Sequence, residues 1–383
     1  MNVILARSEM MRLAITKSRF GAGGGAEKYA SRLVRMFARR VAAVDVITTD
    51  PTPPEDFGPS IRWVSVRALR RNNFLALVSF NAAVNRRLAR ERYDVILGLD
   101  RTERQTHIRA AGGCHAAWLE HRGAASSRIR RIGFRLNPFH RKMLDIERRA
   151  FLATGLKRLI VNSRMVADEI ERHYPGAAGR TLVVHNGVEW TEFQEFFDAG
   201  EASRDRIRGE LGLLPGRYYY LFAGNGFSRK GLAPAIRALA NLPVEAELVV
   251  VGRDNREGDY RRMAVRAGVA TRVHFHGSRR SIIPHLQASD AFVLPTLYDP
   301  FSNACLEALA MGLFTVTSRS NGCAEVIRPG AGAVIQELGS DDSVAETMKA
   351  AMGIRHCRAA IRQTVKGLDI ESQIGKVVDA CLA

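Results

Sequence analysis

The chain has 383 residues, of which 46% are hydrophobic and 25% are charged, and this balance indicates a globular protein rather than a disordered one. Its length predicts two domains of ordinary size, each able to bury a core of its own. No run of eighteen apolar residues occurs, so the sequence predicts no membrane-spanning helix. The first residues are too short and too poorly flanked for a secretory signal, and Met11 is an alternative start to Met1.

The formal net charge of +18 is concentrated in the first half of the chain. Residues 1–190 contain 34 Lys and Arg against 17 Asp and Glu, whereas the remainder contains 23 against 22. This asymmetry predicts a polyanionic partner for the first half, and the alternative is basic charge spread over a solvated surface. The partner would be an anionic lipid surface or a phosphorylated saccharide. Nucleic acid is not expected, because no recognition motif accompanies the charge.

The five cysteines are odd in number and lack the pairing of a metal site; they stand at positions 114, 305, 323, 357 and 381. This pattern predicts free thiols in a reducing cytoplasm. Cys305 and Cys323 are predicted to be packing residues. The sequence predicts no bound metal.

A glycine-rich loop follows the first predicted strand, Leu13–Thr16, and precedes a predicted helix with apolar residues from Tyr29 to Val41 at helical spacing. Glycines at this place let the backbone approach a phosphate or a sugar closely. Gly21-x-Gly23-x-x-Ala26 formally matches a dinucleotide fingerprint, but the acidic residue expected about 20 positions onward is missing. A Rossmann-type NAD(P)-dependent oxidoreductase is therefore an alternative that rests on this match alone. A plain turn between strand and helix is a further alternative.

The middle of the first half predicts a basic amphipathic helix at 81–92 and a buried strand at 93–99 that ends at Asp100. Residues 101–118 are predicted to form a loop that contains Arg109, Gly112 and His115. A lone histidine in a glycine-rich loop can be structural or functional, and the sequence leaves both open. The segment 122–149 that follows interleaves basic and apolar residues, which predicts either a solvated helix pair or contact with anionic lipid headgroups.

The second half opens with a predicted strand at 218–224, followed by a loop that contains Arg229-Lys230-Gly231. Two adjacent cations on a glycine-flanked loop can neutralise a diphosphate. Further strands are predicted at 248–252 and 273–277, and a final helix at 370–382.

The most informative stretch of the second half runs from a buried strand at 291–296 through a loop at 298–300 to a helix that ends at Gly312. We expect Pro300 to open this helix, a strand at 314–317 to follow it, and Asn321-Gly322 to form the next turn. Such a unit belongs to a doubly wound sheet, whose ligands bind at the carboxyl ends of the strands. Asp299 lies in the loop, and Glu307 lies one turn inside the helix, eight positions later.

Two carboxylates that flank free amides at a helix start can hold a polyhydroxylated, phosphorylated ligand. The amides bind phosphate, and the carboxylates accept hydrogen bonds from hydroxyl groups. The alternative is that Asp299 only starts a turn and that Glu307 is a solvated helix residue.

This stretch resembles the acidic-x7-acidic signature of retaining GT-B glycosyltransferases of family 4, which usually reads Glu-Pro-Phe-Gly-x4-Glu. Here Asp299 replaces the first Glu and Ser302 replaces the Gly. Arg229-Lys230-Gly231 is similar to the donor-phosphate motif of the family, and Asn186-Gly187-Val188 is similar to the segment that ends its first domain. Residues 101–118 resemble the acceptor-side loop of the lipopolysaccharide core glucosyltransferase group.

The resemblance implies an α/β fold of two Rossmann-like domains facing a cleft. The first would comprise residues 1–190, with the helix at 368–383 crossing back onto it, and the second would comprise residues 191–367. It also implies a retaining, metal-independent hexosyltransferase that uses a nucleoside diphosphate sugar, UDP-glucose, and no cofactor. The acceptor would be an anionic lipopolysaccharide core or a related envelope glycan. The enzyme would be cytoplasmic and peripheral to the inner face of the membrane, which it would contact through 122–149.

The resemblance assigns roles to individual residues of this chain. Arg229 and Lys230 would stabilise the departing diphosphate, Asp299 would contact the transferred sugar, and Glu307 would hold the ribose. The remaining donor contacts would come from Gly24, Gly226, Gly277, Phe301, Ser302 and Asn303. The acceptor contacts would come from Asp100, Arg109 and His115, of which His115 is also a candidate catalytic group. The second alternative to this reading, beside the oxidoreductase, is a basic nucleic-acid-binding protein.

Overall fold

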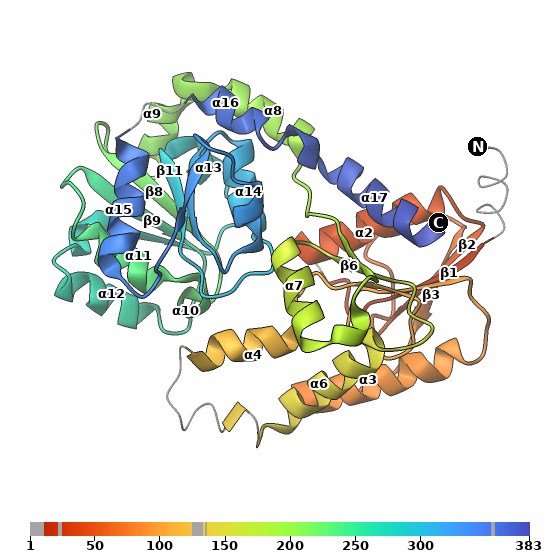
Figure 1. Cartoon of the computed structure of the whole chain (residues 1–383). Helices are drawn as coiled ribbons and strands as arrows, with labels where there is room; N and C mark the ends of the chain where they lie inside the picture. The colour runs from red at the N-terminus through yellow and green to blue at the C-terminus, as the bar shows by residue number, and fades with distance from the viewer. Residues whose placement is uncertain (1–10, 22–24, 125–132, 135, 354–356) are drawn as a thin grey trace. The chain divides into compact units, whose positions relative to one another are not determined.

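The computed structural model describes residues 11–21, 25–124, 133–134, 136–353 and 357–383. The chain divides into two compact units (Figure 1). The first comprises residues 1–185 and 373–383, and the second comprises residues 186–372. The domain boundaries predicted from the sequence, 190/191 and 367/368, lie a few residues from these divisions. Gly24 and much of the basic segment, including Arg130, Arg131 and Arg135, lie outside the described residues.

The first unit contains a parallel sheet of seven described strands in the order β3-β2-β1-β4-β5-β6-β7. Their bounds are Arg12–Thr16 (β1), Ala43–Thr48 (β2), Ile61–Ser65 (β3), Val95–Gly98 (β4), His107–Arg109 (β5), Arg158–Val161 (β6) and Thr181–Val183 (β7). The strand β5 lies within the stretch predicted to be a loop. The sequence did not reveal it, because a strand of three residues is too short to show a hydrophobic period. The strand β3 was not predicted.

Helices flank this sheet, with α2 and α17 on one side and α3 and α6 on the other (Figure 1). The described helices of the unit are Gly25–Ala38 (α2), Asn73–Leu88 (α3), His115–Ala124 (α4), Pro138–Phe151 (α6) and Arg164–His173 (α7), with a 3-10 turn at Pro175–Ala177. The predicted helix at 81–92 was wrong at both ends. The helix begins at Asn73 because the side chain of Asn72 caps it by accepting the N–H of Leu75 at 2.8 Å.

The second unit contains a parallel sheet in the order β10-β9-β8-β11-β12-β13. Its strands are Tyr218–Ala223 (β8), Ala246–Val251 (β9), Val273–Gly277 (β10), Ala291–Leu294 (β11), Phe314–Ser318 (β12) and Gly332–Ile335 (β13). Every residue of β9, β11 and β12 is buried, as expected of parallel strands that are covered on both faces. One large apolar core holds the unit together.

The sequence predicted only part of the described helices of the second unit. They are Trp190–Asp198 (α8), Gly200–Glu210 (α9), Phe227–Lys230 (α10), Leu232–Leu239 (α11), Glu257–Arg266 (α12), Ile283–Ala288 (α13), Asn303–Ala310 (α14), Asp341–Met352 (α15) and Arg358–Gln363 (α16). Short 3-10 turns occur at Ala270–Arg272, Gly322–Val326 and Lys366–Leu368. The short helix α10 occupies part of the predicted loop at 225–231, and α14 begins at Asn303 after the cap Ser302 instead of at Pro300.

The end of α14 agrees with the prediction. Gly312 has a φ of +73°, and a Cβ atom there would lie 2.5 Å from the carbonyl oxygen of Arg358. Only glycine adopts this backbone without strain, so the helix has to end at this position. Cys305 and Cys323 are buried free thiols, which agrees with their predicted packing role.

The final helix α17, Ile370–Leu382, begins in the second unit and continues into the first. It buries Ile374, Val377, Val378 and Cys381 in the first unit. Its Asp379 also lies 2.9 Å from Arg40. Among the described residues, no helix combines the length and the hydropathy that crossing a lipid bilayer requires.

Candidate functional site

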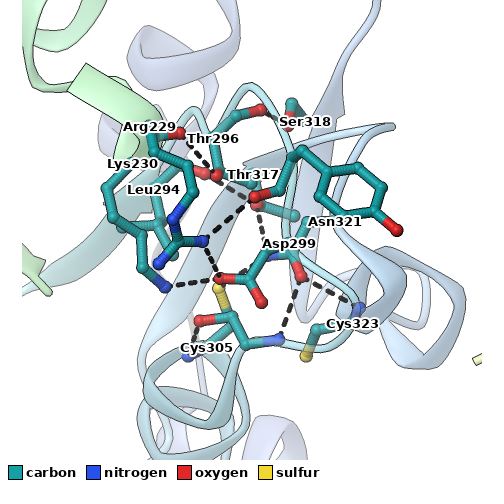
Figure 2. Close-up of polar contacts among 12 residues, drawn as sticks. Arg229, Lys230, Leu294, Thr296, Asp299, Cys305, Thr317, Ser318, Asn321 and Cys323 are labelled. Atoms are coloured by element: carbon teal, nitrogen blue, oxygen red, sulfur yellow. Dashed lines mark hydrogen bonds and ion pairs between the residues drawn. The ribbon is translucent and has the colours of Figure 1, made fainter. Parts of the chain in front are cut away.

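Two cations and one carboxylate meet at the carboxyl ends of β8 and β11 (Figure 2). Arg229 and Lys230 form the last turn of α10, which follows β8, and Asp299 lies in the loop after β11. The Nζ atom of Lys230 forms an ion pair with Oδ2 of Asp299, and Nη1 of Arg229 lies 3.5 Å from the same oxygen. Nη1 of Arg229 also donates to the carbonyl of Tyr298 at 3.1 Å. The sequence therefore predicted residues that the fold brings together.

The Asp299 carboxylate is largely buried between the two cations. Asp299 is 7% exposed, and its Oδ2 atom is shared by the two cations. It lies against Arg229 and Lys230, and its predicted contact with the transferred sugar stays a prediction.

A glycine makes the close approach of α10 to β11 possible. Gly231 has a φ of +81°, and a Cβ atom there would lie 1.7 Å from the carbonyl oxygen of Pro295. Gly226, on the other side of α10, has a φ of +75° but nothing within 4 Å of its Cβ position. The two glycines therefore share a left-handed backbone and differ in the space around them.

We expect Gly231→Ala to destabilise the protein by about 3 kcal/mol or more, since it adds a collision with backbone to the conformational strain. Gly226→Ala is the matched control and should cost only the left-handed strain, about 1–2 kcal/mol. Urea titrations of both variants measure the free energy of unfolding. Equal losses would contradict the importance of the Pro295 contact.

Asn321 joins three elements of the site through one buried side chain (Figure 2). It is 1% exposed, and its Oδ1 atom accepts the N–H groups of Ser302 and Cys323, each at 3.1 Å. Its Nδ2 atom donates to Oγ1 of Thr317 at 2.9 Å and to Sγ of Cys305 at 3.2 Å. All four hydrogen-bonding positions of the amide are used, so the starts of α14 and of the 3-10 turn at Gly322–Val326 are tied to the end of β12.

The sequence predicted Asn321 only as a turn residue. Two of its partners are backbone N–H groups. Nearly every residue type carries such a group, so the sequence does not indicate these contacts. The same contact bears on the predicted phosphate contact of the Ser302 amide. The amide of Ser302 was expected to be free for a phosphate, but its hydrogen is bound by Asn321.

The other predicted donor residues lie around the start of α14 or at strand ends. Glu307 is half-buried on α14, one turn beyond its first residue. Asn303 is exposed, and its Oδ1 atom accepts from Nδ2 of Asn186 at 2.8 Å. Phe301 is 4% exposed. Gly277 ends β10 with a φ of +69° and, like Gly226, has open space at its Cβ position, which leaves room for a ligand.

The predicted acceptor residues all belong to the first unit. Asp100 is half-buried, and its Oδ2 atom accepts the N–H of Ser18 at 2.6 Å, which ties the loop after β4 to the loop after β1. Arg109 is 2% exposed, and its Nη1 atom donates to the carbonyls of Val161 and Val184 at 3.0 and 2.8 Å. These contacts give the guanidinium a structural role inside the unit, and its predicted acceptor contact stays a prediction.

His115 is the first residue of α4 and is 9% exposed. Its Nε2 atom lies 3.2 Å from Nδ1 of His140, and its ring stacks on Trp118 with centroids 5.3 Å apart. Burial, together with Arg101 and His140, lowers the pKa of His115 to about 3, so the imidazole is neutral near pH 7. The candidate catalytic role of His115 stays a prediction, and the imidazole also has a clear packing role.

A buried carboxylate that the sequence did not single out holds the start of α4. Glu147 is fully buried, and both of its oxygens lie 3.0 Å from the N–H of His115. Its Oε2 atom also pairs with Nε of Arg101 at 2.9 Å. Arg101 in turn donates from Nη2 to the carbonyl of Gly113 at 2.7 Å, so the loop before His115 is fixed from both sides.

The described residues contain two parallel-sheet Rossmann-like domains, and in the second the charged groups gather at the carboxyl ends of the strands. This is the architecture of the GT-B glycosyltransferases. The sequence model described as Glycosyltransferase Family 4 matches residues 23–191, and the one described as Glycosyl transferases group 1 matches residues 203–366. The chain belongs to the family 4 and group 1 glycosyltransferases of GT-B fold. This membership removes the oxidoreductase and nucleic-acid-binding alternatives as its class.

Similar proteins act on different acceptors. The chain is 27% identical over 335 residues to D-inositol 3-phosphate glycosyltransferase of Xylanimonas cellulosilytica, covering 80% of this chain and 78% of the relative. It is 27% identical over 225 residues to lipopolysaccharide glucosyltransferase WaaG of Escherichia coli, covering 57% and 59%.

Two solved structures share the fold. The crystal structure of WaaG superposes with a TM-score of 0.78 at 23% identity, covering 96% of this chain and 99% of WaaG. Anabaena HepE in complex with UDP and glucose superposes with a TM-score of 0.67 at 18% identity, covering 96% and 98%.

Proposed function

We propose that this glycosyltransferase moves the hexose glucose from UDP-glucose to an anionic glycan of the cell envelope, with retention of the anomeric configuration. The observation that carries the proposal is the placement of Arg229 and Lys230 at the carboxyl ends of β8 and β11, where ligands of doubly wound sheets bind. The UDP and glucose named for HepE, and the glucosyl transfer named for WaaG, support the choice of donor.

In this mechanism the leaving diphosphate develops negative charge as the glycosidic bond breaks. Arg229 and Lys230 would stabilise that charge, and Glu307 would accept hydrogen bonds from the ribose hydroxyls. Gly226 and Gly277 would let the donor approach the backbone closely, with Phe301 and the amide of Asn303 beside the phosphates. Each well-placed electrostatic contact of this kind contributes about 2.7–4 kcal/mol to catalysis.

A thermal-shift assay with a panel of UDP, GDP and ADP sugars tests the proposal. Saturating donor at 100 times its Kd should add about 2.7 kcal/mol of stability. We expect UDP-glucose to give the largest shift. Proton NMR of the product then reports the anomeric configuration. A panel in which no nucleotide sugar stabilises the protein would overturn the proposed function.

We expect transfer to be independent of metal, since two cations of the protein already lie where the diphosphate would bind. Among the described residues, no group of three or more His, Cys, Asp or Glu could hold a metal ion. The initial rate measured with excess EDTA should equal the rate measured with added Mg²⁺ or Mn²⁺. A strict requirement for either ion would contradict the assignment of Arg229 and Lys230.

The acceptor is proposed to be anionic because the first half of the chain carries almost all of the net charge. Two relatives have names that point the same way, one to an inositol phosphate and the other to lipopolysaccharide. Asp100 and His115 are the proposed acceptor contacts. The lipopolysaccharide core would be reached at the cytoplasmic face of the membrane, with the segment 122–149 against anionic headgroups.

The membrane contact predicts salt-sensitive binding to vesicles that contain acidic lipids. Reversal of Arg130, Arg131 and Arg135 to Glu should abolish this binding, because each cation near such a surface contributes about 1 kcal/mol. Lys142 is left unchanged in this variant, since it pairs with Asp145 at 2.7 Å. Vesicle sedimentation at low and high salt measures the effect.

The matched control reverses three exposed arginines of the second unit by the same charge: Arg256, Arg266 and Arg328. Its vesicle binding should remain close to that of the unmodified protein. Equal loss in both variants would show that total charge, and not the segment 122–149, drives the association.

A further inference from the structure

The pairing of Asp299 suggests a role that differs from the sugar contact implied by the family signature. We infer that Asp299 is a positioning residue, the counter-ion that holds Lys230 and Arg229 in place and limits the affinity of the site for diphosphate. This inference rests on the proposed function, because it assigns the work done by one residue of the proposed donor site.

The first support is the burial of the three charged groups. The side chains of Asp299 and Lys230 are 9% and 12% exposed, whereas that of Arg229 is 42% exposed. A lysine as buried as this needs a nearby negative charge, since removing an ammonium group from water is costly. The aliphatic stem of Lys230 also packs beside Gly224, where an added Cβ atom would lie 3.1 Å from Cε.

The second support is that the backbone of Asp299 is held on both sides. Its N–H donates to the carbonyl of Ser320 at 2.8 Å, and its carbonyl accepts the N–H of Gly322 at 2.9 Å. Asp299 forms an isolated parallel β-bridge with Asn321. The hydrogen-bonding positions of the Asn321 side chain are all used. The backbone that places this short side chain beside Lys230 is therefore fixed on both sides.

The net charge of the site predicts how removal of the Asp299 carboxylate changes diphosphate binding. The two cations and Asp299 together carry one net positive charge, and a diphosphate must bind close to the carboxylate as well as to the cations. Substitution of Asp299 by the isosteric asparagine leaves the charge of Lys230 unneutralised, so that the full charge of the lysine is available to the phosphates. Binding of diphosphate should become stronger, while transfer should become slower because Lys230 loses the group that orients it.

The experiment compares Asp299→Asn with the unmodified protein by calorimetric titration of UDP, UDP-glucose and inorganic pyrophosphate. We expect UDP and pyrophosphate to bind about tenfold more tightly to the variant, as release of one lysine charge within several Å of a diphosphate implies. Loss of folding does not produce tighter binding, so this readout separates positioning from structural damage. If Asp299 instead contacts the sugar, UDP affinity will be unchanged and only UDP-glucose will bind more weakly, which would overturn the inference.

Lys230→Met and the double variant complete a thermodynamic cycle. The effect of Asp299→Asn on UDP affinity should fall to within about twofold in the Lys230→Met background, since the counter-ion acts through that lysine. Full additivity of the two substitutions would overturn the inference. A second variant, Asp299→Glu, keeps the charge and should bind UDP within about twofold of the unmodified protein, so the test stands even where the asparagine variant folds poorly.

The outcomes also separate this inference from the proposed function. If the unmodified protein binds no nucleotide or nucleotide sugar, the proposed function fails. If it binds UDP and the asparagine variant binds UDP equally or more weakly, only the counter-ion role of Asp299 fails.

Discussion

Replacement of Lys230 by alanine is expected to reduce transfer by about 100- to 1000-fold, the loss observed when one preorganised group that stabilises developing charge is removed. Lys230 is the more buried of the two cations, and it forms the closer contact with Asp299. Its removal leaves only Arg229 to balance the carboxylate, so the site would have no net positive charge for the leaving diphosphate. Initial rates with UDP-glucose and a lipopolysaccharide-core acceptor measure the effect.

The matched control is Lys349→Ala, which removes an exposed lysine from the last turn of α15 in the same unit. It should transfer at the unmodified rate. Arg229→Ala should also lose most activity, although Arg229 is the more exposed cation. Transfer by Lys230→Ala within a few-fold of the unmodified rate would remove the central element of the proposed mechanism.

Glu147→Ala is expected to destabilise the protein by about 3–5 kcal/mol, the cost of breaking a buried ion pair by removing one partner. Glu147 is fully buried, and it binds the N–H of His115 as well as Arg101. Its loss leaves the start of α4 without an acceptor and Arg101 without its carboxylate. Urea titration measures the free energy of unfolding.

The control for this prediction is Glu120→Ala, because Glu120 is 56% exposed and pairs with Arg172 at 2.8 Å on the surface. Such a pair contributes about 0–1 kcal/mol. The milder Glu147→Gln variant should raise the KM for the acceptor and leave the KM for UDP-glucose unchanged, since Glu147 holds the loop before His115 and no part of the second unit. Equal destabilisation by Glu147→Ala and Glu120→Ala would show that the buried ion pair of Glu147 contributes no more to stability than a surface ion pair.

Several elements could be predicted from the sequence because their signals are local. The strands β8 and β11 are short apolar runs, and parallel strands that are covered on both faces have this composition. Gly312 ends α14 as predicted, because its left-handed backbone excludes other residues. The helix starts were predicted less well. The caps Asn72 and Ser302 act through hydrogen bonds to backbone, and their residue types are equally common in turns.

The sequence by itself determined the class of the protein and the cation motif, since Arg229-Lys230-Gly231 and the spacing of Asp299 and Glu307 are contiguous patterns. Only the tertiary structure decided what these groups do to one another. Asp299 pairs with Lys230, 69 positions away, and Glu147 reaches Arg101 and His115 from another helix. Arg109 is directed into the interior by a three-residue strand. The physical reason is that burial and hydrogen bonds to distant backbone depend on how the chain packs, and no residue type or spacing records them.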